Sequence, residues 1–171
     1  DGWSMGILLQ ELTALYRAFV TGESSPLAPP PVQYADHAVW QRRWMEGEVL
    51  ERQLAYWRRK LEGATALELP LDCARPPVQT YDGASHRLRW TPDLWQRVVE
   101  LSRREGVTPF MTLLAAFQAL LGRYAAADDV CVGSPIAGRG HQEAEGLVGC
   151  FVNTLVLRTS LAGDPSFREL L

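Results

Sequence analysis

Residues 148–158 read Val-Gly-Cys-Phe-Val-Asn-Thr-Leu-Val-Leu-Arg, an apolar run that holds one amide side chain and ends in a positive charge. The apolar residues stand side by side rather than at alternate positions. This pattern predicts a strand over Phe151–Leu161 that is buried on both faces. Asn153 is polar inside this run, so it needs hydrogen-bond partners if the strand is buried.

Two further strands are predicted upstream of this run. Val130 and Val132 alternate with other residues over Asp129–Ser134, which has the two-residue period of a strand. Residues Ser85–Trp90 show the same period, because His86, Leu88 and Trp90 alternate with Ser85, Arg87 and Arg89.

Amphipathic helices are predicted in the first third of the chain. From about Ser4 to Val20, apolar residues recur at steps of three and four, and Ser4 is the expected N-terminal cap. Gly22 and the proline-rich loop over residues 24–31 should end this helix. Residues 34–60 predict two helices broken near Gly47. The second of these should turn one apolar face to a partner surface: Val49, Leu50, Leu54, Trp57 and Leu61.

Three helix starts are predicted where a capping residue precedes a proline, at Thr91-Pro92, Thr108-Pro109 and Asp164-Pro165. The helix after Thr91 should bury Leu94, Val98 and Leu101 and end near Gly106. The helix after Thr108 is apolar almost all round, which predicts a buried, central helix.

Composition excludes several classes of function. The chain has 171 residues and a formal charge of −3, which gives no electrostatic reason to expect a nucleic-acid partner. The longest apolar run, over residues 110–121, is too short to span a membrane. Three widely spaced cysteines favour a reducing, cytoplasmic location, with Cys131 and Cys150 expected to be buried, and neither they nor the three histidines have metal-ligand spacing.

Three segments, in this order, resemble the condensation domains of nonribosomal peptide synthetases. They are Asp1-Gly2-Trp3-Ser4, Gly133-Ser134-Pro135-Ile136-Ala137-Gly138-Arg139 and residues 148–158. A fourth, Tyr34-Ala35-Asp36-His37-Ala38-Val39-Trp40, is similar to the family's YxDYAVW segment, with His37 in the usual aromatic place. The family's catalytic segment reads HHxxxDG and the chain begins at its Asp, so we expect the catalytic histidine upstream of Asp1.

The resemblance implies an α/β (α+β) fold similar to chloramphenicol acetyltransferase, with two lobes around a tunnel. We expect this chain to be an interior piece of that fold, truncated at both ends. Residues 1–68 would form the end of the N-terminal lobe, 69–82 the crossover linker, and 83–171 the first part of the C-terminal lobe.

The resemblance also implies the roles of individual residues. In the family the motif Asp forms a structural ion pair with an Arg, and Arg139 matches that position, so Asp1 would be a scaffold residue rather than a general base. Gly2 would let the backbone approach the substrate channel, with Trp3, Ser4 and Gly138 also beside it. Asn153 either faces this channel or is a satisfied structural amide.

The implied reaction is amide-bond formation between an upstream acyl or peptidyl thioester and a downstream aminoacyl thioester. Both substrates would arrive on the phosphopantetheine arms of carrier domains, next to an adenylation domain. The resemblance implies no metal and no cofactor bound by the chain itself. Without the upstream histidine, residues 1–171 alone should be inactive.

Two alternatives stay open at the level of sequence. The same scaffold occurs as a non-catalytic condensation-like domain that docks or recruits partners. It also occurs as a heterocyclization domain, although such domains typically read Asp-Ala-Trp-Ser where this chain has Gly2. Epimerization domains usually carry a Val at the position of Trp3.

Overall fold

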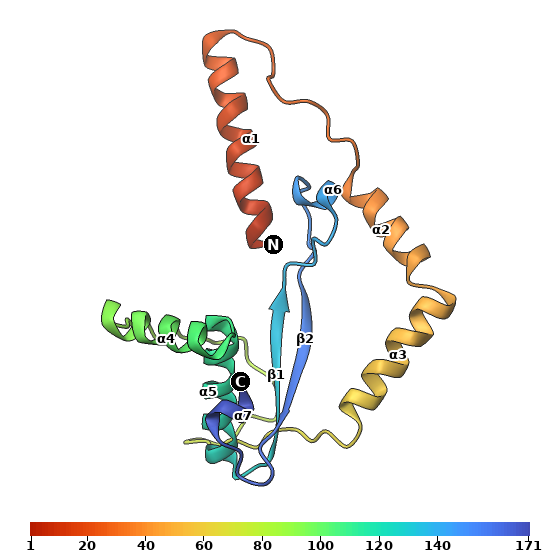
Figure 1. Cartoon of the computed structure of the whole chain (residues 1–171). Coiled ribbons are helices and arrows are strands. Elements are labelled where there is room, and N and C mark those ends of the chain that lie inside the picture. The colour runs from red at the N-terminus through yellow and green to blue at the C-terminus, as the bar shows by residue number, and fades with distance from the viewer. The chain divides into compact units, whose positions relative to one another are not determined.

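A computed structural model describes all residues 1–171 and contains seven helices and two strands (Figure 1). The chain divides into two compact units, each described here by itself. The first unit comprises residues 1–62 and 133–156, and the second comprises residues 63–132 and 157–171.

Three helices of the first unit come from its N-terminal part: α1 (Gly2–Thr21), α2 (Tyr34–Trp44) and α3 (Gly47–Leu61). The predicted break near Gly47 is confirmed. Gly22 ends α1 in the left-handed conformation, at φ 72°, which glycine adopts without steric cost. The five apolar residues predicted for one face of α3 are each half-buried.

The predicted cap of α1 was wrong. The helix begins at Gly2 rather than Ser4, and the cap is Asp1, whose side chain accepts a hydrogen bond from the backbone N–H of Ser4. Aspartate is as good a cap as serine, and its charge also suits the positive end of the helix dipole. The predicted apolar face is present but stays exposed in this chain, with Leu12 at 60% and Phe19 at 75%.

The first unit also contains the short helix α6 (Gln142–Glu145). Ala144, Leu147 and Phe151 form its buried apolar cluster. Figure 1 shows the N-terminus of the chain beside the segment that carries α6. This part of the unit therefore brings the first residues of the chain close to residues some 140 positions later in the sequence.

Helices α4 (Pro92–Glu105), α5 (Pro109–Ala125) and α7 (Phe167–Leu170) belong to the second unit. Both predicted threonine caps are confirmed, because Thr91 accepts from the N–H of Leu94 and Thr108 from the N–H of Met111. A buried hydrogen bond of 2.8 Å between the hydroxyls of Ser102 and Thr112 joins α4 to α5.

Two predictions for these helices were wrong. Helix α5 buries only one narrow face, made of small and polar residues, while Phe117 is 48% exposed. A helix that is apolar on every side can be buried, but its burial requires other elements packed on each side. In this chain α5 is packed on one face only. On α4, Leu94 is likewise 45% exposed, whereas Val98 and Leu101 are half-buried.

The third predicted cap was also wrong. Asp164 has a positive φ of 53° and caps nothing, whereas Ser166 accepts from the N–H of Glu169 at the start of α7. A capping residue needs an extended backbone, which Ser166 has and Asp164 lacks.

Strands β1 (Asp129–Ile136) and β2 (Asn153–Ser160) pair in a two-stranded sheet, so two of the three predicted strands are confirmed. Leu161 N–H donates to the carbonyl of Asp128, which sets the end of β2 beside the start of β1 and makes the pair antiparallel. Val130 is fully buried. Burial of β2 on both faces was a wrong prediction, because residues 155–159 are only half-buried and the start of the strand is exposed.

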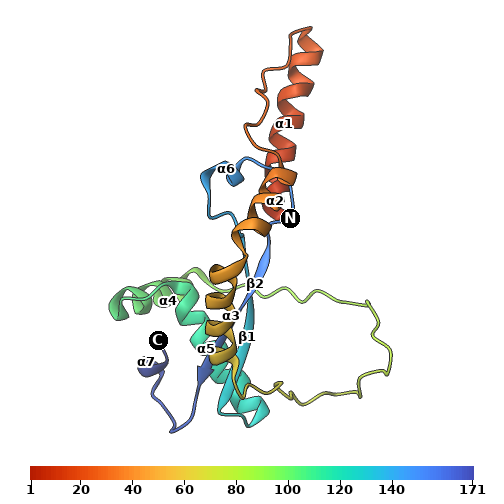
Figure 2. The same ribbon diagram turned by 90° about the vertical axis from the view of Figure 1, so that its right-hand side faces the viewer.

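The predicted strand over Ser85–Trp90 was also wrong. Residues 64–91 contain no helix or strand, and Figure 2 shows them as an extended connection. The side chains of residues 85–90 are all exposed. Alternation describes the two faces of a strand but does not supply the neighbouring strand that completes its hydrogen bonds.

The cysteine prediction holds only in part, because Cys131 is half-buried but Cys150 is exposed, and all three cysteines are free. None of the helices combines the length and apolarity that crossing a lipid bilayer would need.

Candidate functional site

The site begins with the carboxylate of Asp1 at the start of α1. Its Oδ1 atom accepts from the backbone N–H of Ser4 at 2.9 Å and lies 2.8 Å from the Ser4 hydroxyl. Its Oδ2 atom accepts from the N–H of Phe151 at 3.0 Å. The carboxylate therefore joins the first turn of α1 to the segment just before β2.

Arg139 follows β1 and reaches the same carboxylate. Its Nη2 atom lies 3.3 Å from Oδ1 and 3.5 Å from Oδ2 of Asp1. The two side chains are 2% and 3% exposed, so this is a buried ion pair. A buried charge is costly without partners. Arg139 has further ones, because Nη1 donates to the carbonyls of Ala144 and Leu147.

The guanidinium of Arg139 also lies over an aromatic ring. Its Cζ atom is 4.1 Å from the centre of the Phe151 ring, within the range of a cation–π contact. The Nε atom of Arg139 is buried and has no hydrogen-bond partner. Phe151 therefore contacts Arg139 through its ring and Asp1 through its backbone.

Gly138, next to Arg139, lies close to the backbone of Phe151 and has an unusual backbone conformation. Its φ is 67°, in the left-handed region that favours glycine. A Cβ atom at this position would also overlap the carbonyl oxygen of Phe151. Close approach to the backbone of residue 151 is therefore a reason for glycine at this position.

The segment over residues 34–40 joins the same cluster through aromatic contacts. Tyr34 donates its hydroxyl hydrogen to the carbonyl of Cys150 at 2.8 Å. Its ring lies against Gly149, where a Cβ atom would overlap it. Tyr34 and His37 both meet the Phe151 ring edge-on, with centroid distances of 5.1 and 4.9 Å. The four sequence motifs thus meet around Phe151.

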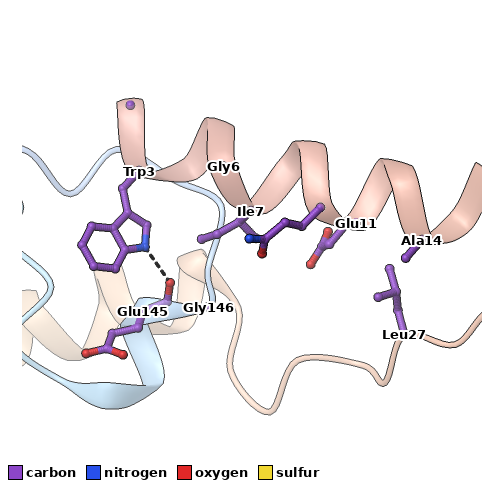
Figure 3. Close-up of a pocket in the computed structure, with 10 residues that line it drawn as sticks. Trp3, Gly6, Ile7, Glu11, Ala14, Leu27, Glu145 and Gly146 are labelled. Atoms are coloured by element: carbon purple, nitrogen blue, oxygen red, sulfur yellow. Dashed lines mark hydrogen bonds between the residues drawn. The ribbon is translucent and has the colours of Figure 1, made fainter.

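Trp3 lies at the edge of this cluster. Its indole N–H donates to the carbonyl of Glu145 at 3.0 Å, and the side chain is 52% exposed (Figure 3). Trp3 and Gly2 line a pocket of about 920 Å³ that extends along α1 to Ala14. Nothing lies within 4 Å of the position where a Cβ atom of Gly2 would stand. Trp3 connects this pocket to the buried ion pair, because the Cζ atom of Arg139 lies 5.7 Å from the centre of its ring.

The structure places the predicted site residues in two environments. Asp1, Ser4 and Arg139 are in mutual contact, and Ser4, which the resemblance placed at the channel, is buried at 4% exposure. Asn153 is exposed, and its side-chain oxygen accepts from the N–H of Thr154. Asn153 therefore has only a local hydrogen bond, and its exposed side chain is compatible with both interpretations.

Phe151, Gly149 and Tyr34 are parts of the site whose roles the sequence did not predict. All three lie within the recognised motifs, which is the one signal that pointed to them. Their role depends on contacts between residues more than 100 positions apart, such as Tyr34 with Cys150.

The hydrogen bonds define what this site can do chemically. Both oxygens of Asp1 are occupied by donors from Ser4, Phe151 and Arg139. Neither oxygen of this carboxylate is left without a hydrogen-bond donor. No group of three or more His, Cys, Asp or Glu side chains is arranged to hold a metal ion.

Comparisons with known proteins point to one family. The family model described as "Condensation domain" matches residues 1–171. A subunit of the linear gramicidin synthase of Brevibacillus parabrevis is 60% identical over 172 residues, which covers 100% of this chain and 3% of that protein. The chain therefore spans only a small part of the length of this relative.

Two solved structures have the same fold. SgcC5 protein from Streptomyces globisporus matches with a TM-score of 0.82 and 35% identity, over 99% of this chain and 38% of that one. The complex of the X-domain and OxyB from teicoplanin biosynthesis contains a chain that matches with a TM-score of 0.91 and 30% identity, over 99% and 39%. The predicted α/β (α+β), chloramphenicol-acetyltransferase-like fold is confirmed, as a partial piece of it.

Proposed function

This chain belongs to the condensation-domain family, and on that premise we propose that it forms part of an enzyme of nonribosomal peptide synthesis that makes amide bonds. The 60% identity to the linear gramicidin synthase of Brevibacillus parabrevis supports this proposal most directly, since it extends over the whole chain. The product would be a peptide of the antibiotic or secondary-metabolite kind.

In the proposed reaction, the amine nitrogen of a carrier-bound aminoacyl group attacks the thioester carbonyl carbon of a carrier-bound acyl or peptidyl group. The C–N bond forms as the C–S bond breaks, and the proton lost by the nitrogen balances the thiolate that leaves as a thiol. Both substrates would be delivered on phosphopantetheine arms, with an adenylation domain as a further neighbour. Holding the two ends together supplies much of the rate acceleration.

The residues in this chain would act by positioning. The buried pair of Asp1 and Arg139 fixes the start of α1 against the backbone of Phe151. The pocket beside Gly2 and Trp3 is connected to this pair through Trp3, and a substrate arm could lie there. The proposed crossover linker over residues 69–82 lies within residues 64–91, which contain no helix or strand.

A second candidate function is docking without catalysis. The high TM-score to the X-domain that was solved in complex with OxyB supports this alternative. A heterocyclization domain is less well supported, because Gly2 stands where such domains typically have Ala.

The test is a reconstitution of the intact protein with a donor carrier and an acceptor carrier, each loaded with a different aminoacyl-phosphopantetheine. Intact-protein mass spectrometry should find the dipeptidyl group on the acceptor carrier. Omission of the donor load is the control. If the carriers bind but the acceptor never gains mass, the amide-forming proposal is wrong and the docking function is favoured.

A further inference from the structure

Ser4 carries no charge, yet its side chain makes hydrogen bonds to both charged residues of the site and to the backbone of Gly149. It is 4% exposed, and four polar atoms surround its Oγ atom. These are Oδ1 of Asp1 at 2.8 Å, the carbonyl of Gly149 at 2.7 Å, Nη2 of Arg139 at 2.8 Å and the N–H of Gly149 at 3.0 Å. We propose that Ser4 is a positioning residue, whose hydroxyl makes the Asp1–Arg139 pair into a three-residue unit that holds residues 149–151.

The four neighbours use the full bonding capacity of a hydroxyl and exceed it by one acceptor. A serine hydroxyl has one hydrogen to donate and two lone pairs to accept with. Arg139 and the N–H of Gly149 are the two donors, so both lone pairs are used. The single hydrogen is shared between two acceptors, Asp1 and the carbonyl of Gly149. An alanine at this position would leave all four groups without this partner, inside a buried site.

The distances indicate that Ser4, rather than direct contact, carries much of the link between the two charges. Nη2 of Arg139 is 3.3 and 3.5 Å from the Asp1 oxygens, longer than an ordinary N–H···O hydrogen bond. The same Nη2 is 2.8 Å from Ser4, and Ser4 is 2.8 Å from Asp1. The two shortest hydrogen bonds that connect Asp1 and Arg139 therefore both involve the hydroxyl.

This arrangement connects Ser4 to a group that it does not touch. The N–H of Phe151 donates to Oδ2 of Asp1, whereas Ser4 contacts Oδ1 of the same carboxylate. If Ser4 sets the orientation of Asp1, loss of its hydroxyl should also weaken the hydrogen bond of Phe151. A serine that merely fills space would leave that hydrogen bond intact.

The structural part of this inference is independent of the reaction; its effect on turnover rests on the proposed function. The experiment therefore has two readouts on the intact protein. Hydrogen–deuterium exchange reports the amides of Gly149 and Phe151 in wild type, Ser4→Ala and Ser4→Thr. The steady-state rate of dipeptide formation on loaded carriers gives kcat and KM for the same three proteins.

Tyr34→Phe is the matched control for exchange. It removes the hydrogen bond from Tyr34 to the carbonyl of Cys150. Cys150 lies between Gly149 and Phe151, but this hydrogen bond does not involve Asp1, Ser4 or Arg139. Exchange at Phe151 should stay within about twofold of wild type in this control, because its N–H partner Asp1 is untouched.

In Ser4→Ala, the amides of Gly149 and Phe151 should both exchange about tenfold faster, the effect expected from losing one hydrogen bond. Ser4→Thr keeps a hydroxyl and should restore most of the protection at both amides. We expect kcat to fall by about tenfold to a hundredfold in Ser4→Ala with KM little changed, because the defect is one of alignment.

Faster exchange at Gly149 alone, with Phe151 at the wild-type rate, would overturn the inference, since Ser4 would then not act through Asp1. Better protection in Ser4→Ala than in Ser4→Thr would also overturn it, because packing would then matter more than the hydroxyl. If neither variant folds, Ser4→Cys replaces them: its thiol is a weak donor and acceptor, so wild-type exchange at both amides would contradict the proposal.

The two readouts separate this inference from the proposed function. Coupled exchange in a protein that forms no dipeptide would leave the role of Ser4 intact and refute the reaction. Dipeptide formation without a change in Phe151 exchange in Ser4→Ala would support the reaction and refute the role of Ser4.

Discussion

The carboxylate of Asp1 and the guanidinium of Arg139 lie 3.3 Å apart although 138 sequence positions separate them. Both side chains are almost completely buried, at 3% and 2% exposure. Each charge offsets part of the cost of burying the other. This dependence should make the first unit sensitive to the loss of either residue.

Replacement of Arg139 by Met should destabilise the protein strongly. The variant keeps an apolar side chain against Phe151 but leaves the Asp1 carboxylate buried without its counter-ion, which costs about 3–5 kcal/mol. Denaturant titration of the intact protein measures the free energy of unfolding. Arg97→Met is the control, because the Arg97–Asp93 pair is exposed at 74% and 73% and should contribute less than about 1 kcal/mol. Equal effects of the two substitutions would refute the role of the buried pair.

Gly138→Ala should also be destabilising, for a steric reason. The position has a φ of 67°, and the new Cβ would overlap the carbonyl oxygen of Phe151. We expect a loss of at least about 1–3 kcal/mol from backbone strain alone, measured in the same titration. Gly140→Ala is the matched control two residues away, where nothing lies within 4 Å of the new Cβ. A neutral Gly138→Ala would mean that residues 138 and 151 do not approach each other as described.

Gln118→Leu tests a buried polar contact in the second unit. Gln118 is 2% exposed, donates to the carbonyl of Leu157 at 2.9 Å and accepts from the hydroxyl of Thr159 at 3.0 Å. Leucine would leave both partners unsatisfied, at a cost of about 1–3 kcal/mol. Gln96→Leu removes an exposed hydrogen bond on α4 and should change stability by less than about 0.5 kcal/mol. A similar, small effect of both variants would contradict the observed burial of Gln118.

The Asp129–Arg158 pair should make stability depend on pH in the acid range. Hydrogen bonds from Arg158, at 2.9 and 2.7 Å, hold the pKa of Asp129 below its ordinary value, against the opposing effect of desolvation. Because the folded-state pKa is the lower one, the contribution of the pair is complete above the unfolded carboxyl pKa of about 3.9. It is lost as the pH falls through the folded-state pKa.

The measurement is the difference in free energy of unfolding between wild type and Asp129→Asn across pH. It should be constant between about pH 5 and pH 7 and shrink below about pH 4. Asp93→Asn, in an exposed pair, should show little difference at any pH. A difference that grows as the pH falls would contradict a lowered pKa of Asp129 in the folded state.

Local hydrogen bonding made several helix limits predictable from the sequence. Thr91 and Thr108 cap helices because each is followed by a proline and lies three residues before the N–H that it accepts from. Where two capping residues stood near one another, local pattern did not decide between them. Asp1 was the cap where Ser4 was predicted, and Ser166 where Asp164 was predicted.

Burial and strand pairing were less predictable, because both depend on distant chain. Periodicity located the apolar face of α1, yet Phe19 on that face is exposed; α5 is apolar almost all round, yet its Phe117 is also exposed. The alternation over Ser85–Trp90 is genuine in the sequence, but no strand lies beside it. A sequence pattern indicates which side chains can be buried, and the fold determines what buries them.

The site was predictable only through its motifs. Nothing in the composition or periodicity links Asp1 to Arg139, and their pairing was expected from the resemblance alone. The position of Ser4 between them was not expected, since the resemblance placed Ser4 beside the substrate. A hydroxyl with four polar neighbours becomes visible only when residues 1–4, 139 and 149 are brought together in space.

The measurement that tests the central claim most directly is a single-turnover assay of the intact protein with both carriers loaded in advance. The account predicts that the dipeptidyl thioester appears on the acceptor carrier as the donor thioester disappears. It also predicts that a folded Arg139→Met variant forms it at least about a hundredfold more slowly. Loss of the donor acyl group only to water, or equal rates in wild type and Arg139→Met, would contradict the claim that this buried unit positions an amide-forming site.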